Sequence, residues 1–260
     1  NYFKFFASLS RIIMNKTAII IPSRLNALRL PNKPLELINN KEMILHVYDA
    51  AIKSKVGEVY IATPDQKIVD VVKKFGGNVI KTLEEHETGT DRIYEVFKKT
   101  LNGLPDVVIN LQGDMPNINS KDISALAHYM NKKKCEIGTL ASSIKSNIEL
   151  ENPNVVKVAV NEKFSENKFI KAIDFVRIKE DSTYQLYHHV GIYAFTNKAL
   201  VRYVSLKRSK LELKRKLEQL RALENDMSIH VGYIKSFPLS VDTREDLIEV
   251  KKLMEKNEKR

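Results

Sequence analysis

Apolar residues in the first half of the chain follow two kinds of spacing, one typical of strands and one typical of helices. Residues 17–21 form a continuous apolar run, as in a strand buried on both faces. Residues 43–54 instead place Ile44, Val47 and Ala51 at helical intervals. The same patterns predict further strands at 58–62, 78–81 and 106–111, and helices at 66–75, 90–101 and 120–132. Strands that alternate with helices of this length predict βαβ units and a mostly parallel sheet with helices on both faces.

The second half has a looser rhythm, in which strand-like runs predominate. These runs cover residues 137–144, 155–160, 169–175 and 190–195, and a long helix is expected over 209–224, a strand over 229–234 and a final helix from about 243. We expect an α/β fold with a mixed, mostly parallel central sheet flanked by helices. No internal repeat or low-complexity linker divides the chain, so we expect one domain over 14–260, with an excursion at about 150–190.

The first thirteen residues are basic and aromatic and contain no acidic residue. They are compatible with a remnant of an organellar targeting peptide. They are equally compatible with an upstream extension, because Met14 begins MNKTAIII, which reads as a natural start followed by a strand. We favour the second interpretation and predict that 1–13 are not needed for the fold.

Composition and charge exclude several classes of protein. The chain of 260 residues has one cysteine, which excludes a disulfide framework and a cysteine-rich metal site. No apolar run approaches the ~20 residues that span a bilayer, so no membrane partner is expected. The net charge of +11 suggests nucleic-acid binding. However, the excess lies in residues 1–16, 132–134, 207–216 and 251–260 without interleaved aromatics, so a basic nucleic-acid-binding module is only the alternative hypothesis.

Familiar nucleotide-binding and catalytic motifs are missing from the sequence. There is no GxGxxG, no P-loop, no HExxH, no CxxC and no GxSxG. If this protein binds a nucleotide, it therefore uses another kind of phosphate-binding site.

A basic loop after the first predicted strand is a candidate for such a site. It brings Arg24, Arg29 and Lys33 to the carboxyl edge of the sheet, where open α/β folds bind ligands. Pro31 and Pro34 forbid a helix there, so the segment has to form a shaped loop. Guanidinium and ammonium groups suit a triphosphate or pyrophosphate. A solvated basic loop is the alternative.

Two aspartates are candidate ligands of a divalent cation. Asp114 follows a buried strand directly after Gly113, where a carboxylate opposite a basic loop suits Mg²⁺ held together with substrate phosphates. Its alternative role is to cap a turn. Asp242 precedes the last predicted helix and has capping-box spacing to Glu245, so it is either a helix cap or a second metal ligand.

Seven sequence fragments together resemble one family. They are Pro22-Ser-Arg24, Arg29-Leu-Pro-Asn-Lys-Pro-Leu35, His86-Glu-Thr-Gly-Thr-Asp-Arg92, Asn110-Leu-Gln-Gly-Asp114, His189-Val-Gly-Ile-Tyr193, Leu217-Glu-Gln-Leu-Arg221 and Val241-Asp-Thr-Arg-Glu-Asp-Leu247. In this order and at these spacings, over residues 16–253, the chain resembles the CMP-Kdo synthetases (3-deoxy-manno-octulosonate cytidylyltransferases), which are glycosyltransferase-A-like nucleotidyltransferases with a Rossmann-like fold.

The resemblance implies a reaction and its site residues. CMP would be transferred from CTP to the anomeric hydroxyl of Kdo, with release of pyrophosphate, in a cytoplasmic homodimer that uses Mg²⁺ for lipopolysaccharide precursor synthesis. The implied residues are Arg24, Arg29 and Lys33 for the CTP phosphates, Thr88, Gly89, Arg92 and Gln112 for the cytidine, Asp114 and Asp242 for Mg²⁺, and Arg177, His189, Tyr193, Glu218 and Gln219 for the sugar acid. Arg24, Lys33, Asp114 and Asp242 would form the catalytic set.

Some residues have other interpretations, and some depart from the family pattern. His189 also fits a buried core histidine, Tyr193 a packing residue, and Glu218 and Gln219 a solvated helix face. The departures are Asn32 in place of a glycine, Pro64 and Met115 in place of acidic residues, Val176 in place of a serine, and Arg215 in place of a glutamate. They bear mainly on the sugar acid, so an amino-Kdo or a sialic-acid-like acceptor is the alternative substrate.

Overall fold

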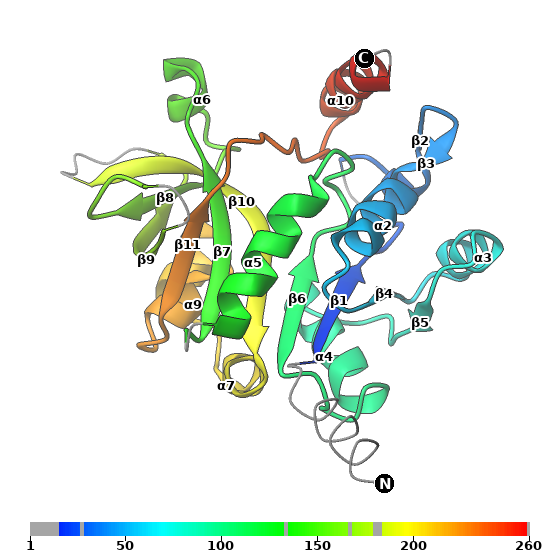
Figure 1. Ribbon diagram of the computed structural model, residues 1–260, viewed down its shortest axis with the longest axis horizontal. Coiled ribbons are helices and arrows are strands. Elements are labelled where there is room, and N and C mark those ends of the chain that lie inside the picture. Colours follow the sequence, from blue (N-terminus) through cyan, green and yellow to red (C-terminus); the bar gives the residue numbers. More distant parts are fainter. Residues whose placement is uncertain (1–15, 27–28, 133–134, 166–167, 179–183, 259–260) are drawn as a thin grey trace, which may run out of the picture.

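A nine-stranded sheet runs through the centre of the computed structural model (Figure 1), which describes residues 16–26, 29–132, 135–165, 168–178 and 184–258. The prediction for residues 1–13 lies outside these residues. The strands are β1 (Thr17–Pro22), β4 (Glu58–Thr63), β5 (Val79–Lys81), β6 (Val107–Leu111), β7 (Ile137–Ser142), β8 (Lys157–Val160), β9 (Phe169–Val176), β10 (Gln185–Thr196) and β11 (Ile229–Tyr233). A separate ribbon pairs β2 (Leu37–Ile38) with β3 (Lys41–Glu42).

The sheet is mixed, as predicted, and its two halves differ. In the order β5-β4-β1-β6-β10-β7-β11-β9-β8, the first four strands are parallel. β10 is antiparallel to β6, β7 and β8, and β9 is antiparallel to β8 and β11. Parallel pairing therefore predominates only in the first half, and β8 and β9, which come from the 150–190 segment, lie at the far edge of the same sheet.

Helices cover both faces of the sheet. They are α2 (Met43–Ser54), α3 (Gln66–Lys74), α4 (Gly89–Lys99), α5 (Ser120–Lys132), α6 (Asn147–Glu151), α7 (Asn197–Ser205), α8 (Lys210–Arg215), α9 (Leu220–Leu223) and α10 (Arg244–Glu258), with a short 3₁₀ turn η1 (Lys33–Leu35). Successive side chains of β1 point to opposite faces, so Ile19 and Ile21 pack with α2 and α5 in one core while Ile20 packs in the other. Among the described helices, none is long and apolar enough to span a membrane.

The predicted helix over 209–224 is wrong, because the chain breaks it at Lys216. Ser209 and Glu212 form a capping box that starts α8, and Lys216 then adopts a left-handed conformation with φ 54°. This turn directs Leu217 into the core, where it is 4% exposed. The helical spacing of the sequence does not reveal this break. The break is needed only because Glu212 and Leu217 are both buried in the folded protein.

Two smaller differences also concern the second half. The strand predicted from 190 begins five residues earlier, at Gln185, because its first residues pair with β8. The short helix α6 was not predicted, and Ser146 caps its first turn.

Candidate active site

A cleft of about 540 Å³ opens at the carboxyl ends of β1 and β6, where the sequence predicted ligand binding. It is lined by Pro22, Ser23, Arg24, Asn26, Arg29, Lys33, Pro34, His86, Glu87, Thr88, Gly89, Arg92, Gln112, Gly113, Asp114 and Asp242. All the residues predicted for CTP and for the metal are in this list. The structure therefore brings together four segments that are far apart in the sequence.

The described residues of the basic loop, 22–26 and 29–34, are held by backbone hydrogen bonds at both ends of the loop. The amide of Ser23 donates to the carbonyl of Ala62 at 2.9 Å, and that of Leu25 donates to Asp65 Oδ2 at 2.9 Å. The amide of Asn32 returns to the carbonyl of Leu25 at 3.0 Å. Asn32 itself is left-handed, with φ 58°, and it starts the η1 turn that presents Lys33 to the cleft. The solvated-loop alternative does not predict these hydrogen bonds of the described residues.

Lys33 lies between the two predicted metal ligands. Its Nζ is 3.0 Å from Asp114 Oδ2 and 3.1 Å from Asp242 Oδ1, and Arg29 contacts the other oxygen of Asp242 at 2.9 Å. Burial lowers the pKa of Lys33, but the charges and hydrogen bonds of the two carboxylates outweigh burial and raise it. Lys33 is therefore a protonated ammonium at neutral pH.

Asp242 does not cap α10, so the proposed capping pair of Asp242 with Glu245 is wrong. The capping box is formed one position later, where the amide of Asp246 donates to Thr243 Oγ1 at 3.2 Å and the amide of Thr243 donates to Asp246 Oδ2 at 2.8 Å. The Asp242 carboxylate is thereby left to face the cleft. The backbone amide of Val241 also donates to the carbonyl of Asp114 at 2.9 Å, which fixes the two aspartates side by side.

The C-terminal segment is held at the cleft by a small core of its own. Leu30 from the basic loop and Ile38 and Met43 from the following elements pack with Val241 and Leu247. The same apolar contacts thus hold both the loop that carries Lys33 and the segment that carries Asp242.

The residues at this position fit a Mg²⁺ ion that is completed by phosphate oxygens. Two carboxylates that bind one ammonium are close enough to share a small cation, and proteins commonly hold Mg²⁺ by one or two carboxylates together with substrate phosphates. Among the described residues no cluster of three or more His, Cys, Asp or Glu side chains could hold a metal without such help.

Arg92 contributes to the cleft mainly by holding its wall. It is 3% exposed, and its guanidinium donates to Thr82 Oγ1 and to the carbonyls of Leu83, at 2.8 Å, and Glu84, at 3.2 Å. Thr88 caps α4 through a capping box with Asp91. The 82–88 segment is thus fixed at both ends. The guanidinium of Arg92 supports this segment and is not free to bind a phosphate.

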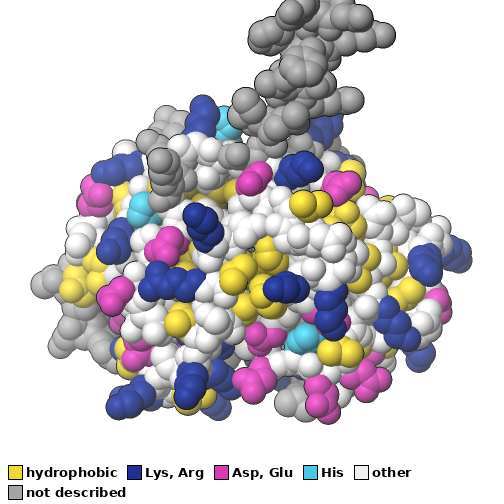
Figure 2. All heavy atoms as spheres, turned by 90° about the horizontal axis from the view of Figure 1, so that it is seen from below, with side chains coloured by type: hydrophobic (Ala, Val, Ile, Leu, Met, Phe, Trp, Pro, Cys, Tyr) yellow, Lys and Arg dark blue, Asp and Glu magenta, His cyan; other side chains and the backbone are white. Residues whose placement is uncertain are grey.

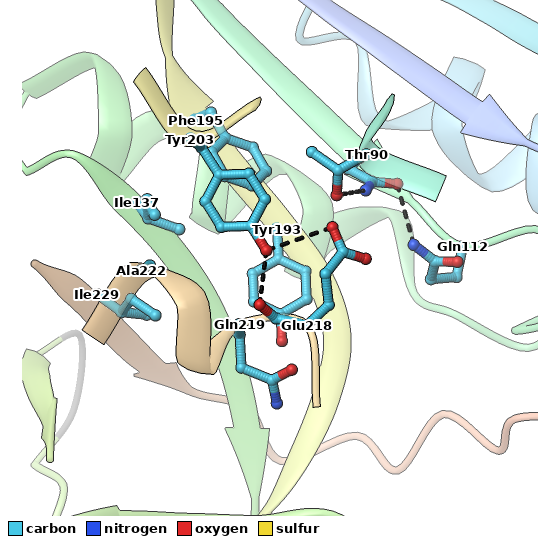
Figure 3. A pocket seen from close by; sticks show the side chains of 11 residues that line it. Thr90, Gln112, Ile137, Tyr193, Phe195, Tyr203, Glu218, Gln219, Ala222 and Ile229 are labelled. Carbon is cyan, nitrogen blue, oxygen red and sulfur yellow. Dashed lines mark hydrogen bonds between the residues drawn. The ribbon is translucent and has the colours of Figure 1, made fainter. Parts of the chain in front are cut away.

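A second, smaller hollow adjoins the cleft at Gln112, which lines both (Figure 3). Tyr193, Glu218 and Gln219, three of the residues predicted for the sugar acid, line it together with Thr90 and Tyr203. Its volume is only about 30 Å³, which is room for about one water molecule. In this conformation a sugar can therefore touch these side chains only from the mouth of the hollow.

Burial shifts the pKa of two acidic groups at this hollow. Burial raises the pKa of Glu218, and hydrogen bonds to Thr90 and the charge of Arg221 oppose the rise. Burial and the neighbouring Glu218 raise the pKa of Tyr193 well above its usual value. Tyr193 is therefore a neutral hydroxyl that can donate a hydrogen bond.

His189 and Arg177 do not line either hollow. His189 is buried, its Nε2 is 2.9 Å from Thr139 Oγ1, and burial lowers its pKa to about 3. Its ring packs behind Tyr193, at 5.3 Å between centroids. The Arg177 guanidinium donates to the carbonyls of Pro153, Arg215 and Lys216. The structure thus supports the interpretation of His189 as a buried core histidine. The side chain of Arg177 hydrogen-bonds to neighbouring backbone carbonyls.

Some residues of the cleft and of the small hollow were not singled out from the sequence. Ser23, His86 and Glu87 lie inside sequence motifs that the resemblance already used, so the sequence could have pointed to them. Nothing in the neighbouring sequence distinguishes Asn26 or Tyr203 as a site residue. Ser23 Oγ is buried and has no hydrogen-bond partner among the described residues, although it lines the cleft. It is therefore free to bind a ligand.

An α/β sheet with a shaped basic loop and two aspartates at its carboxyl edge defines the class of nucleotidyltransferases. The model of the cytidylyltransferase family matches residues 18–229, and the chain belongs to this family. A 3-deoxy-manno-octulosonate cytidylyltransferase from Brucella ovis is 44% identical over 234 residues, which cover 89% of this chain and 93% of the relative. The protein of the same name from Brucella anthropi is 42% identical over 89% of this chain and 94% of its own length.

Solved structures give the same result. A CMP:2-keto-3-deoxy-manno-octonic acid synthetase complexed with CTP is similar with a TM-score of 0.84 at 36% identity, over 93% of this chain and 99% of that chain. A 4-diphosphocytidyl-2C-methyl-D-erythritol synthase from Anaerococcus prevotii, 13% identical with a TM-score of 0.61 over 93% of this chain and 99% of its own, shares the fold alone.

Proposed function

We propose that this cytidylyltransferase transfers CMP from CTP to the anomeric hydroxyl of 3-deoxy-manno-octulosonate (Kdo) and releases pyrophosphate. The observation that carries the proposal is the cluster of Lys33, Asp114 and Asp242 beside a basic loop in one cleft. The relatives named for this reaction support the choice of nucleotide and acceptor.

The cleft residues divide into two groups by chemistry. Arg24 and Arg29 are exposed and line the cleft, where their guanidinium groups can each bind a phosphate through two hydrogen bonds. The ammonium of Lys33 adds a compact positive charge. Thr88, Gly89 and Gln112 also line the cleft, and their amide and backbone groups suit a pyrimidine and its ribose. Arg92 supports the wall of the cleft.

The reaction is an in-line displacement at phosphorus. The anomeric oxygen of the acceptor forms a bond to the α-phosphorus, the bond to the bridging oxygen breaks, and the hydroxyl proton goes to solvent. Negative charge that grows on the departing pyrophosphate is neutralised by Arg24 and Lys33. Asp114 and Asp242 would hold Mg²⁺, which would supply further neutralisation of charge and would lower the pKa of a coordinated hydroxyl.

The acceptor lies on the Gln112 side of the cleft in this proposal. Tyr193, Glu218 and Gln219 contact it from the mouth of the small hollow, while His189 supports Tyr193 from behind. Arg177 reaches a sugar carboxylate only if it leaves its present backbone partners. The protein acts in this proposal as a cytoplasmic homodimer that supplies an activated sugar for lipopolysaccharide precursors.

A basic nucleic-acid-binding role gains no support from the face of the molecule in Figure 2. On the described part of the face in Figure 2, Lys and Arg side chains are interspersed with Asp and Glu rather than gathered in one patch.

Pyrophosphate release tests the proposal. CTP with Kdo should give turnover, while UTP or ATP with Kdo should give little. CTP should also be offered with 8-amino-Kdo and with a sialic acid, because faster turnover with either would replace Kdo as the acceptor. No release with CTP and any of these acids would contradict the proposal.

A further inference from the structure

Glu218 and Gln219 lie on a segment that cannot hold its own shape. They follow the left-handed Lys216 and precede α9, which has only four residues. Isolated helices of this length are not stable in water, so the surrounding structure has to fix the segment. What fixes it also sets where the two side chains point.

A buried ion pair ties this segment to α8. Glu212 is 0% exposed and Arg221 is 3% exposed, and Arg221 donates through Nε to Oε2 at 2.9 Å and through Nη2 to Oε1 at 2.7 Å. Burial raises the pKa of Glu212, but hydrogen bonds from Arg221 and Arg208 outweigh it and lower the pKa. Such a two-bond contact allows little rotation of α9 relative to α8.

Tyr203 connects the ion pair to Glu218. The Arg221 guanidinium lies over the Tyr203 ring, 5.0 Å from its centroid. The Tyr203 hydroxyl donates to the backbone carbonyl of Glu218 at 2.7 Å and lies 3.3 Å from Glu218 Oε1 (Figure 3). One hydroxyl therefore contacts both the main chain and the carboxylate of Glu218.

We propose that Tyr203, held by the Glu212–Arg221 pair, is a positioning residue that sets Glu218 and Gln219 toward the acceptor. The inference rests on the proposed function, since it assumes that these two residues face the sugar acid. It assigns Tyr203 no contact with CTP, because Tyr203 lines the small hollow and not the main cleft.

Tyr203→Phe tests the proposal, because it removes only the hydroxyl. Tyr48→Phe is the matched control: Tyr48 is also buried, at 4% exposed, its hydroxyl also bonds a backbone group, the amide of Asn78, and it lines neither hollow. We expect Tyr203→Phe to raise the KM for the acceptor by about 3- to 10-fold, the size of one lost hydrogen bond, and to change the KM for CTP by less than about twofold. Tyr48→Phe should change neither.

Hydrogen exchange gives a second readout that does not depend on turnover. Amides of residues 217–222 should exchange faster in Tyr203→Phe than in the wild type, and Tyr48→Phe should leave them unchanged. An acceptor KM equal to that of the control, or unchanged exchange in this segment, would overturn the proposal. If the wild type has no activity with Kdo, the proposed function fails, while the exchange experiment still decides whether Tyr203 orders the segment.

Discussion

Asp242 lies beside the first turn of α10, but Thr243 and Asp246 cap that turn. Asp242→Asn should therefore keep the helix and the melting temperature while it removes one of two charges at the metal position. Loss of transition-state stabilisation at such a site costs about 10²–10³ in kcat. Asp114→Asn should cost a similar factor, and the double variant little more, because residues that act as one unit are not additive.

Thr243→Ala is the control for this prediction. It removes the cap, so the free energy of unfolding should fall by about 1 kcal/mol while turnover stays near the wild type. Wild-type turnover by Asp242→Asn would contradict the shared metal site.

Lys33 binds two carboxylates in the free protein and is assigned to the CTP phosphates. Lys33→Ala should therefore raise the KM for CTP much more than the KM for the acceptor. Steady-state kinetics with each substrate varied in turn measures both. A change confined to the acceptor KM would show that the basic loop does not bind phosphates.

Burial of His189 makes the free energy of unfolding depend on pH. Its pKa is about 6.5 when exposed and about 3 in the folded protein, because burial disfavours the charged ring. Between these values the unfolded state binds the extra proton, so the free energy of unfolding falls as the pH is lowered below about 6.5. From pH 7 to pH 5 this residue should account for a loss of about 2 kcal/mol.

Urea unfolding of wild type and His189→Gln at both pH values measures that loss. The variant should lose about 2 kcal/mol less than the wild type over this range. Equal losses would show that His189 is not buried as a neutral ring.

Among the elements, the basic loop depends on one unusual backbone conformation. Asn32 adopts φ 58°, where most residues with a Cβ are strained by about 1–2 kcal/mol. Its amide bond to Leu25 closes the loop just before Lys33. Glycine and asparagine tolerate this left-handed backbone better than other residues do, which fits asparagine at this position.

Asn32→Gly and Asn32→Val should therefore differ. The glycine variant should keep the melting temperature and the KM for CTP near wild-type values. The valine variant should lose about 1–2 kcal/mol of stability and bind CTP more weakly, as measured by calorimetry. Equal behaviour of the two variants would mean that the conformation of Asn32 does not set the position of Lys33.

The same elements explain what the sequence could predict. Buried runs such as β1 and β6 have strong local signals, and each delivers its site residues directly at its carboxyl end. The break between α8 and α9 depends on the burial of Glu212 against Arg221, which has no local signature. The cap of α10 was misplaced by one residue, since Asp242 and Thr243 are both good capping residues.

At the scale of the whole molecule, the predicted cleft forms because one sheet edge gathers segments from β1, β6, α4 and the approach to α10 (Figure 1). That convergence follows from the order of the parallel strands and could be predicted. The antiparallel pairing of the second half could not be predicted, because strand-like runs do not specify their partners. The placement of Arg177 and His189 depends on those pairings.

³¹P NMR of the products shows whether the cleft joins CMP to a sugar acid. With wild-type protein, CTP, Kdo and Mg²⁺, we predict one new phosphodiester resonance and an equal amount of pyrophosphate, both abolished when Mg²⁺ is chelated. Pyrophosphate release without any new phosphodiester resonance, or formation of CDP with a phosphorylated sugar, would contradict the proposed reaction, because the bond formed would then not join the α-phosphorus to the acceptor.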